Sequence, residues 1–180
     1  HVFDADKVKG GLRVHWAKGG ETITALDDKT YSLEPGMMAI SDAEGVESIA
    51  GVMGGLATGC TETTVNVFVE SAYWDPVTIA ATGRRLKINS DARYRFERGV
   101  DPAFTPVGLD MAVAMVLELC GGEASEMVVA GAVPDTNRSY KLDTARVSSL
   151  VGMEIPAKTQ IATLEALGFI VKGDDVSPPS

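Results

Sequence analysis

Residues 89–102 have the sequence NSDARYRFERGVDP, and two helix boundaries fall within this stretch. Ser90 belongs to the residue types that cap helix N-termini, so a helix is predicted over residues 91–98. Asp101 and Pro102 predict the start of a longer helix, because Pro is favoured at the first helical position and Asp just before it. The stretch therefore indicates that the middle of the chain is helical.

The longer helix carries apolar side chains at helical spacing. Four of them recur at i, i+4, i+7 and i+11, namely Leu109, Val113, Val116 and Cys120. This spacing places them on one face of a helix. The pattern predicts that this face packs in the core of the domain.

The part of the chain before these helices is predicted to form strands. Polar and apolar residues alternate in short stretches across residues 11–70. The clearest strand covers residues 65–70, where Val65, Val67 and Val69 share one face. These residues therefore predict a β-rich first part.

The last part of the chain is predicted to be a separate unit. Turn-forming residues occupy 134–137, and two short helical patterns follow over residues 143–151 and 157–167. Strands followed by helices indicate an α+β fold class. We expect an α+β domain over residues 1–136 and a small helical domain over residues 137–180.

Several stretches resemble a known family. Residues 89–102 are similar to the signature T-x-A-S-x-R-F-E-R-G-V-D-P of the phenylalanyl-tRNA synthetase β-subunit family of bacterial type. Four shorter stretches resemble further landmarks and follow the family's order, namely residues 1–4 (HVFD), 51–55 (GVMGG), 68–72 (FVESA) and 81–85 (ATGRR). The resemblance covers the whole chain.

The resemblance implies a specific part of that protein. Residues 1–136 are similar to its paired third and fourth modules, an editing domain expected to be a layered structure built on mixed sheets. Residues 137–180 are similar to the start of its small helical fifth module. In this family the editing domain hydrolyses tyrosine that has been mischarged onto tRNA-Phe. The chain, which lacks an initiating Met, is expected to be a piece of a longer polypeptide.

Partners and cofactors follow from the same resemblance. The acceptor end of tRNA-Phe and the α subunit of an α2β2 heterotetramer are the expected partners. The α subunit carries the aminoacylation site, where the full enzyme, a cytoplasmic ligase, uses ATP and magnesium. No cofactor is expected in this fragment, and the fragment alone is not expected to aminoacylate.

Five residues are expected to form the substrate-binding editing pocket: His1, Gly54, Glu70, Ser90 and Ala92. From the residues alone, Glu70 is a solvated carboxylate at the end of a strand. By resemblance, Glu70 recognises the tyrosine hydroxyl, and His1 accompanies it. Gly54, Ser90 and Ala92 would form the pocket wall, with Ser90 replacing the more usual Thr.

Arginines form the densest basic group in the chain. Arg84, Arg85, Arg93 and Arg95 allow two interpretations, intramolecular ion pairs or contacts with the tRNA. The first is the more common use of such residues, because surface arginines near carboxylates usually pair with them. The second agrees with the need to hold an acceptor end at the pocket.

Composition and motifs restrict the function further. A formal net charge of −9 argues against a broad nucleic-acid-binding surface. No run of about 18 apolar residues is present, so no membrane span is expected. Cys60 and Cys120 belong to no zinc motif, and the chain lacks a G-x-S-x-G nucleophile motif. No metal site is therefore expected, and no catalytic group is assigned. The alternative function is a non-catalytic scaffold that binds tRNA.

Overall fold

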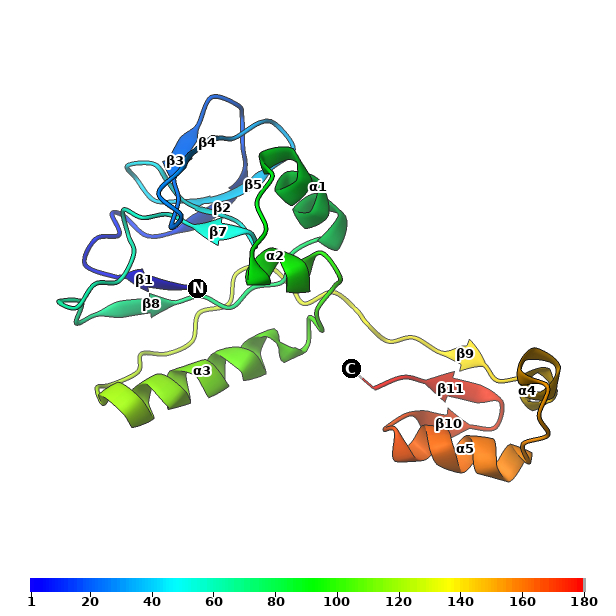
Figure 1. Ribbon diagram of the computed structural model, residues 1–180. Helices are drawn as coiled ribbons and strands as arrows, with labels where there is room; N and C mark the ends of the chain where they lie inside the picture. Colours follow the sequence, from blue (N-terminus) through cyan, green and yellow to red (C-terminus); the bar gives the residue numbers. More distant parts are fainter. Residues whose placement is uncertain (180) are drawn as a thin grey trace. The chain divides into compact units, whose positions relative to one another are not determined.

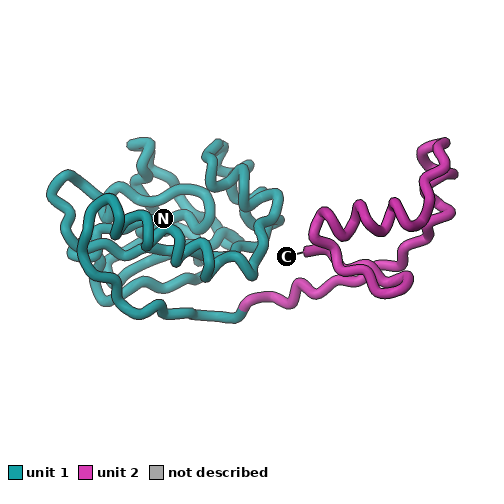
Figure 2. The backbone as a smooth tube through the Cα atoms, turned by 90° about the horizontal axis from the view of Figure 1, so that it is seen from below, with its two compact units in different colours: residues 1–132 teal, residues 133–180 magenta. Residues whose placement is uncertain are grey.

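The computed structural model describes residues 1–179 and divides the chain into two compact units (Figures 1 and 2). The first unit covers residues 1–132 and the second begins at Val133. Helices and strands occur in both units, so the predicted α+β class is confirmed. The boundary expected after residue 136 lies in the same extended segment of the chain.

The first unit contains three antiparallel sheets (Figure 1). The largest has the strand order β2-β5-β6-β7 and comprises Arg13–Trp16, Met38–Ser41, Val46–Ile49 and Met53–Gly54. Two smaller sheets pair β3 (Thr22–Thr24) with β4 (Thr30–Ser32), and β1 (Val2–Asp4) with β8 (Val67–Val69). The expectation of mixed sheets was wrong for the described residues, because every strand pair there is antiparallel. Short connections between successive strands favour antiparallel pairing.

The core of the first unit lies between the sheets and the first helix. Phe3, Leu33, Ile49, Val52 and Ile79 are its largest fully buried side chains. They come from strands, loops and a helix that are up to seventy-six positions apart in the chain. Burial of such side chains contributes roughly 1.5–3 kcal/mol each to the stability of the unit.

Two short helices follow strand β8, and both begin at a capping residue. The Asp75 carboxylate accepts from the Thr78 N–H at 2.8 Å and starts α1 (Pro76–Leu86). Ser90 caps α2 (Asp91–Phe96), as the sequence predicted. The two helices contact one another.

The third helix, α3 (Phe104–Cys120), corrects the sequence analysis. The predicted core stripe was wrong for the described residues, because none of the α3 side chains is buried there and Cys120 is exposed. A separate stripe of large apolar side chains is exposed, namely Phe104, Val107, Met111, Met115 and Leu119. Periodicity identifies side chains that favour burial, but it does not supply the surface that covers them.

The second unit contains two helices and a three-stranded sheet. The helices are α4 (Thr144–Val151) and α5 (Ala157–Ala166). The sheet has the order β10-β11-β9 and comprises Ile170–Lys172, Asp175–Ser177 and Tyr140–Lys141. The sheet was not predicted, because strands of two or three residues are too short for a clear alternation. Across residues 1–179, no helix is long and apolar enough to cross a membrane.

Candidate editing pocket

The pairing of β1 with β8 brings His1 and Glu70 together. The main-chain nitrogen of His1 donates to the Glu70 carbonyl at 3.0 Å, and the Glu70 N–H donates to the His1 carbonyl at 2.8 Å. The ladder continues through Val2 and Val69. Two of the predicted pocket residues are therefore direct neighbours, although sixty-nine positions separate them in the chain.

Gly54 lies directly against the imidazole of His1. A Cβ atom placed on Gly54 would overlap the His1 ring, so only glycine leaves room for the ring in this position. The ring also meets Phe3 edge to face, with 4.5 Å between ring centroids. The His1 side chain is thus held between a buried aromatic ring and the backbone of strand β7.

Glu70, whose main chain pairs with that of His1, offers a partly desolvated carboxylate. Burial raises the pKa of the Glu70 carboxyl above its ordinary value. Among residues 1–179, no side chain donates a hydrogen bond to the Glu70 carboxylate. The group is therefore able to accept a hydrogen bond from a ligand hydroxyl.

Ser90 connects α2 to the segment that leads into strand β7. Its hydroxyl donates to the Val52 carbonyl at 2.5 Å and accepts from the Arg93 N–H at 3.1 Å. Ala92 lies two residues further, half-buried in the first turn of α2. The structure therefore joins His1 with Gly54 and Glu70 directly, and ties Ser90 to the chain two residues before Gly54.

Comparison with known proteins identifies the family. The B3/4 domain profile matches residues 1–121. The chain belongs to the B3/4 domain family. The phenylalanine–tRNA ligase β subunit of Ruegeria pomeroyi is 68% identical over 180 residues, which are 100% of this chain and 23% of that protein.

Other relatives of this B3/4 domain carry the same name. The phenylalanine–tRNA ligase β subunit of Cereibacter sphaeroides is 66% identical, over 100% of this chain and 22% of that protein. That of Paramagnetospirillum magneticum is 52% identical, over 100% of this chain and 23% of that protein. The chain therefore spans less than a quarter of the length of these relatives. The resemblance of the sequence to the phenylalanyl-tRNA synthetase β-subunit family is therefore confirmed.

The B3/4 domain uses one of the four candidate arginines inside its own fold. The Arg93 side chain is 14% exposed, and its Nε donates to the Glu97 carboxylate at 2.9 Å. Its Nη1 donates to the Ile88 carbonyl at 2.6 Å. A Cβ on Gly83 would overlap the Arg93 side chain, so the guanidinium group lies between α1 and α2. Arg93 therefore links the two helices.

The other three arginines lie at the surface of the domain. Arg85 pairs with the Glu34 carboxylate at 2.8 Å, an exposed pair of little energetic weight. Within residues 1–179, the Arg95 side chain donates only to the Asp91 carbonyl, at 3.5 Å. Arg84 is exposed in the last turn of α1. Arg84 and Arg95 thus retain the exposure that contact with a nucleic acid requires.

The sequence analysis missed a buried polar pair in the B3/4 domain. Glu47 on β6 is 6% exposed and Thr58 is 2% exposed. The Thr58 hydroxyl donates to the Glu47 carboxylate at 2.8 Å. Burial raises the pKa of the Glu47 carboxyl, and the hydrogen bond from Thr58 partly offsets the shift. The sequence gives no clear signal of this pair, because strand β6 has the sequence VESI, in which polar and apolar residues do not alternate.

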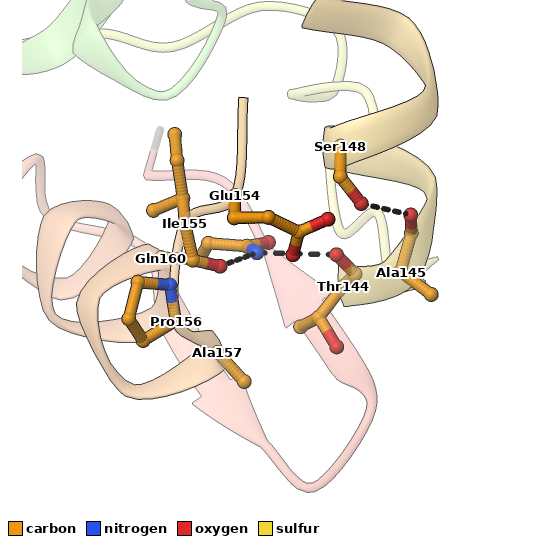
Figure 3. Close-up of a pocket in the computed structure, with 8 residues that line it drawn as sticks. All are labelled: Thr144, Ala145, Ser148, Glu154, Ile155, Pro156, Ala157 and Gln160. Carbon is orange, nitrogen blue, oxygen red and sulfur yellow. Dashed lines mark hydrogen bonds between the residues drawn. The ribbon is translucent and has the colours of Figure 1, made fainter. Parts of the chain in front are cut away.

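A cavity of about 380 Å³ lies in the second unit, at the junction of α4 and α5 (Figure 3). The Gln160 amide nitrogen donates to the carbonyls of Thr144 and Ile155, at 3.1 and 2.7 Å. The cavity contains none of the predicted pocket residues. Within residues 1–179, no cluster of His, Cys, Asp and Glu suited to a metal ion is found.

Proposed function

We propose that this chain provides the editing site of a phenylalanine–tRNA ligase β subunit and hydrolyses tyrosine mischarged onto tRNA-Phe. One observation carries the proposal: Glu70, whose carboxylate is partly desolvated, pairs through its main chain with His1, and the His1 imidazole rests on Gly54. These are three of the five residues that the family resemblance assigns to the pocket.

Glu70 accounts for the choice between the two amino acids. A tyrosine hydroxyl would donate to the carboxylate, whereas phenylalanine would leave this partly buried acceptor unpaired. An unmade hydrogen bond to a charged group costs on the order of 3 kcal/mol, or roughly a hundredfold in affinity. A synthetic pocket rejects an added hydroxyl only weakly, so a second site that requires the hydroxyl is needed. Correctly charged phenylalanine is therefore spared.

Hydrolysis is assigned to an attacking water rather than to an enzyme nucleophile. The pocket would hold the aminoacyl ester so that water reaches its carbonyl carbon, and the ester bond to the tRNA ribose then breaks. Main-chain N–H groups and the terminal hydroxyl of the tRNA would stabilise the developing negative charge. The products are free tyrosine and uncharged tRNA-Phe.

The partners of the chain belong to the proposal. The acceptor end of tRNA-Phe delivers the ester, and the exposed Arg84 and Arg95 are candidate contacts for its phosphates. The α subunit completes an α2β2 heterotetramer, located in the cytoplasm, that uses ATP and magnesium for aminoacylation. Editing itself needs no cofactor in this part of the β subunit.

Deacylation of tyrosyl-tRNA-Phe by the full heterotetramer tests the proposal. Replacing Glu70 by Ala is expected to slow the reaction and to narrow the preference for tyrosine over phenylalanine by roughly a hundredfold. Glu62→Ala, at an exposed position of the same segment, is the matched control and should behave as the parent. Parental rate and selectivity in the Glu70→Ala enzyme would refute the assignment.

A non-catalytic scaffold is the second candidate function. The exposed apolar stripe of α3 favours it, because such surfaces are often covered by another polypeptide. The same assay separates the two candidates. A scaffold predicts no change in deacylation when Glu70 is replaced.

A further inference from the structure

The two walls of the candidate pocket are connected beneath its surface by hydrogen bonds. One wall is strand β1, which begins beside His1, and the other is the Gly54–Gly55 segment. The connection runs through Glu47 and Thr58, which are both buried. Neither residue belongs to the set that the family resemblance assigns to the pocket.

Glu47 is hydrogen-bonded to the Gly54–Gly55 segment through its main chain and to Thr58 through its side chain. Its main-chain carbonyl accepts from the Gly55 N–H at 2.7 Å, and its carboxylate accepts from the Thr58 hydroxyl at 2.8 Å. A Cβ on Gly55 would lie 2.7 Å from the Glu47 carbonyl oxygen, so a residue with a side chain could not approach Glu47 as closely. A shift of Glu47 therefore moves the Gly54–Gly55 segment with it.

Thr58 holds the wall that strand β1 forms. Its main-chain carbonyl accepts from the Asp4 N–H, at the end of β1, at 2.8 Å. Asp4 is itself fixed, because its carboxylate accepts from the Thr64 hydroxyl at 2.7 Å and from the Asp6 N–H at 3.1 Å. Since Asp4 is the last residue of the three-residue strand β1 and His1 directly precedes its first, the position of Thr58 constrains that of His1.

A buried carboxylate is an expensive way to connect two strands. Desolvating an ionised group costs several kcal/mol unless hydrogen bonds compensate, and an apolar side chain of similar volume would stabilise the sheet at least as well. What Glu47 and Thr58 supply is a fixed distance, because a hydrogen bond is directional and a hydrophobic contact is not. A fixed distance between two walls is useful in a pocket, because a ligand must be held in one geometry.

We propose that Glu47 and Thr58 are positioning residues of the editing pocket. The hydrogen bond between them sets the spacing between His1 and Gly54. This inference rests on the proposed function. A displacement of one wall by about 1 Å is enough to lower a catalytic rate by up to a hundredfold, even when neither residue touches the substrate.

Thr58→Val in the full heterotetramer tests the inference, because it removes the hydroxyl and keeps the side-chain shape. We expect kcat for tyrosyl-tRNA-Phe deacylation to fall about tenfold, with KM changed by less than about threefold and the tyrosine preference reduced. Thr58→Ser keeps the hydroxyl and should restore parental kinetics. Glu47→Asp withdraws the carboxylate from Thr58 and should match Thr58→Val, which provides a second route if the valine variant folds poorly.

Ser41→Ala is the matched control. Ser41 is also buried in the same sheet, and its hydroxyl pairs with His15 Nε2 at the same distance of 2.8 Å, but it belongs to neither wall. Its kcat and selectivity should stay within about twofold of the parent, as expected for a site that does not couple to the pocket.

Each outcome has a defined consequence. An equal loss of kcat in Thr58→Val and Ser41→Ala would indicate general destabilisation and would overturn the inference. Unchanged kcat and selectivity in Thr58→Val, with Glu70→Ala impaired, would overturn the inference and leave the proposed function standing. A parental enzyme that does not hydrolyse tyrosyl-tRNA-Phe would overturn both.

Discussion

At Gly54 a single missing Cβ makes room for the imidazole of His1, although the backbone itself does not require glycine. Gly54 is not among the glycines with positive φ, so an L-residue fits the backbone there. Its Cβ would nevertheless overlap the His1 ring. Glycine is therefore required at position 54 because the His1 ring occupies the space that a side chain would fill, and not because of the backbone conformation.

Gly54→Ala is therefore expected to displace His1 while leaving the fold intact. Deacylation of tyrosyl-tRNA-Phe should fall at least about tenfold, as expected for a misplaced pocket wall, with little change in melting temperature. Gly45→Ala is the control, because Gly45 has open space around it and no positive φ. Full activity in Gly54→Ala would show that the position of His1 is not important for the reaction.

Glu47 predicts a pH dependence of stability. Its pKa is raised above 4.5 by burial, so the folded state favours the protonated form and disfavours the ionised one. Its contribution to folding is therefore most favourable below the unfolded-state pKa, and it is lost as the pH rises through the raised pKa of the folded state.

Glu47→Gln removes this titration. Relative to the parent, the variant should gain free energy of unfolding between about pH 4.5 and neutral pH, as measured by urea unfolding at several pH values. Glu44→Gln, at an exposed position nearby, should show a much smaller change. An equal difference between Glu47→Gln and the parent at all pH values would contradict the raised pKa.

At the scale of elements, the packing of α1 against α2 depends on Arg93, which the sequence does not distinguish from the nearby Arg95. Arg93 and Arg95 are two positions apart on the same short helix. Arg93 donates to Glu97 and to the Ile88 carbonyl, whereas Arg95 points to solvent with one long hydrogen bond. The first stabilises the helix pair and the second is available to a partner.

Alanine substitutions should separate these two roles. Arg93→Ala is expected to lower the free energy of unfolding by about 1–3 kcal/mol, because it leaves a carbonyl and a carboxylate without their charged donor. Arg95→Ala should change the free energy of unfolding by less than about 0.5 kcal/mol and should weaken tRNA binding. Chemical denaturation and a tRNA-binding titration at fixed salt measure both. The reverse result would assign Arg93 to the tRNA.

At the scale of the whole molecule, the chain consists of two compact units. Gln160 holds α4 and α5 together in the second unit, because its amide nitrogen donates to the carbonyls of Thr144 and Ile155. The two accepting carbonyls fix the orientation of the amide. A carboxylate in its place cannot donate either bond.

Gln160→Glu is therefore expected to destabilise the second unit alone. Hydrogen exchange should show a loss of about 1–3 kcal/mol of protection in α4 and α5 at neutral pH, with no change in residues 1–132. Lys158→Gln, an exposed change on the same helix, is the control. Loss of protection in both units would show that they unfold together.

The features that the sequence determined by itself are local ones. Ser90 and Asp75 start helices because a capping side chain reaches N–H groups only three residues away. The stretch at residues 89–102 and its companions indicated the family, and the order of strands and helices indicated the α+β class. Each of these depends on residues close together in the chain.

Tertiary structure decided the rest, because the deciding contacts join residues that are far apart in the sequence. The pairing of β1 with β8 brings His1 to Glu70, and the close approach of β7 brings Gly54 under the His1 ring. Glu47 is buried and accepts a hydrogen bond from Thr58, eleven positions further along the chain. The exposure of α3 has the same origin: an apolar helix becomes part of a core only when another surface covers it, and its own sequence does not contain that surface.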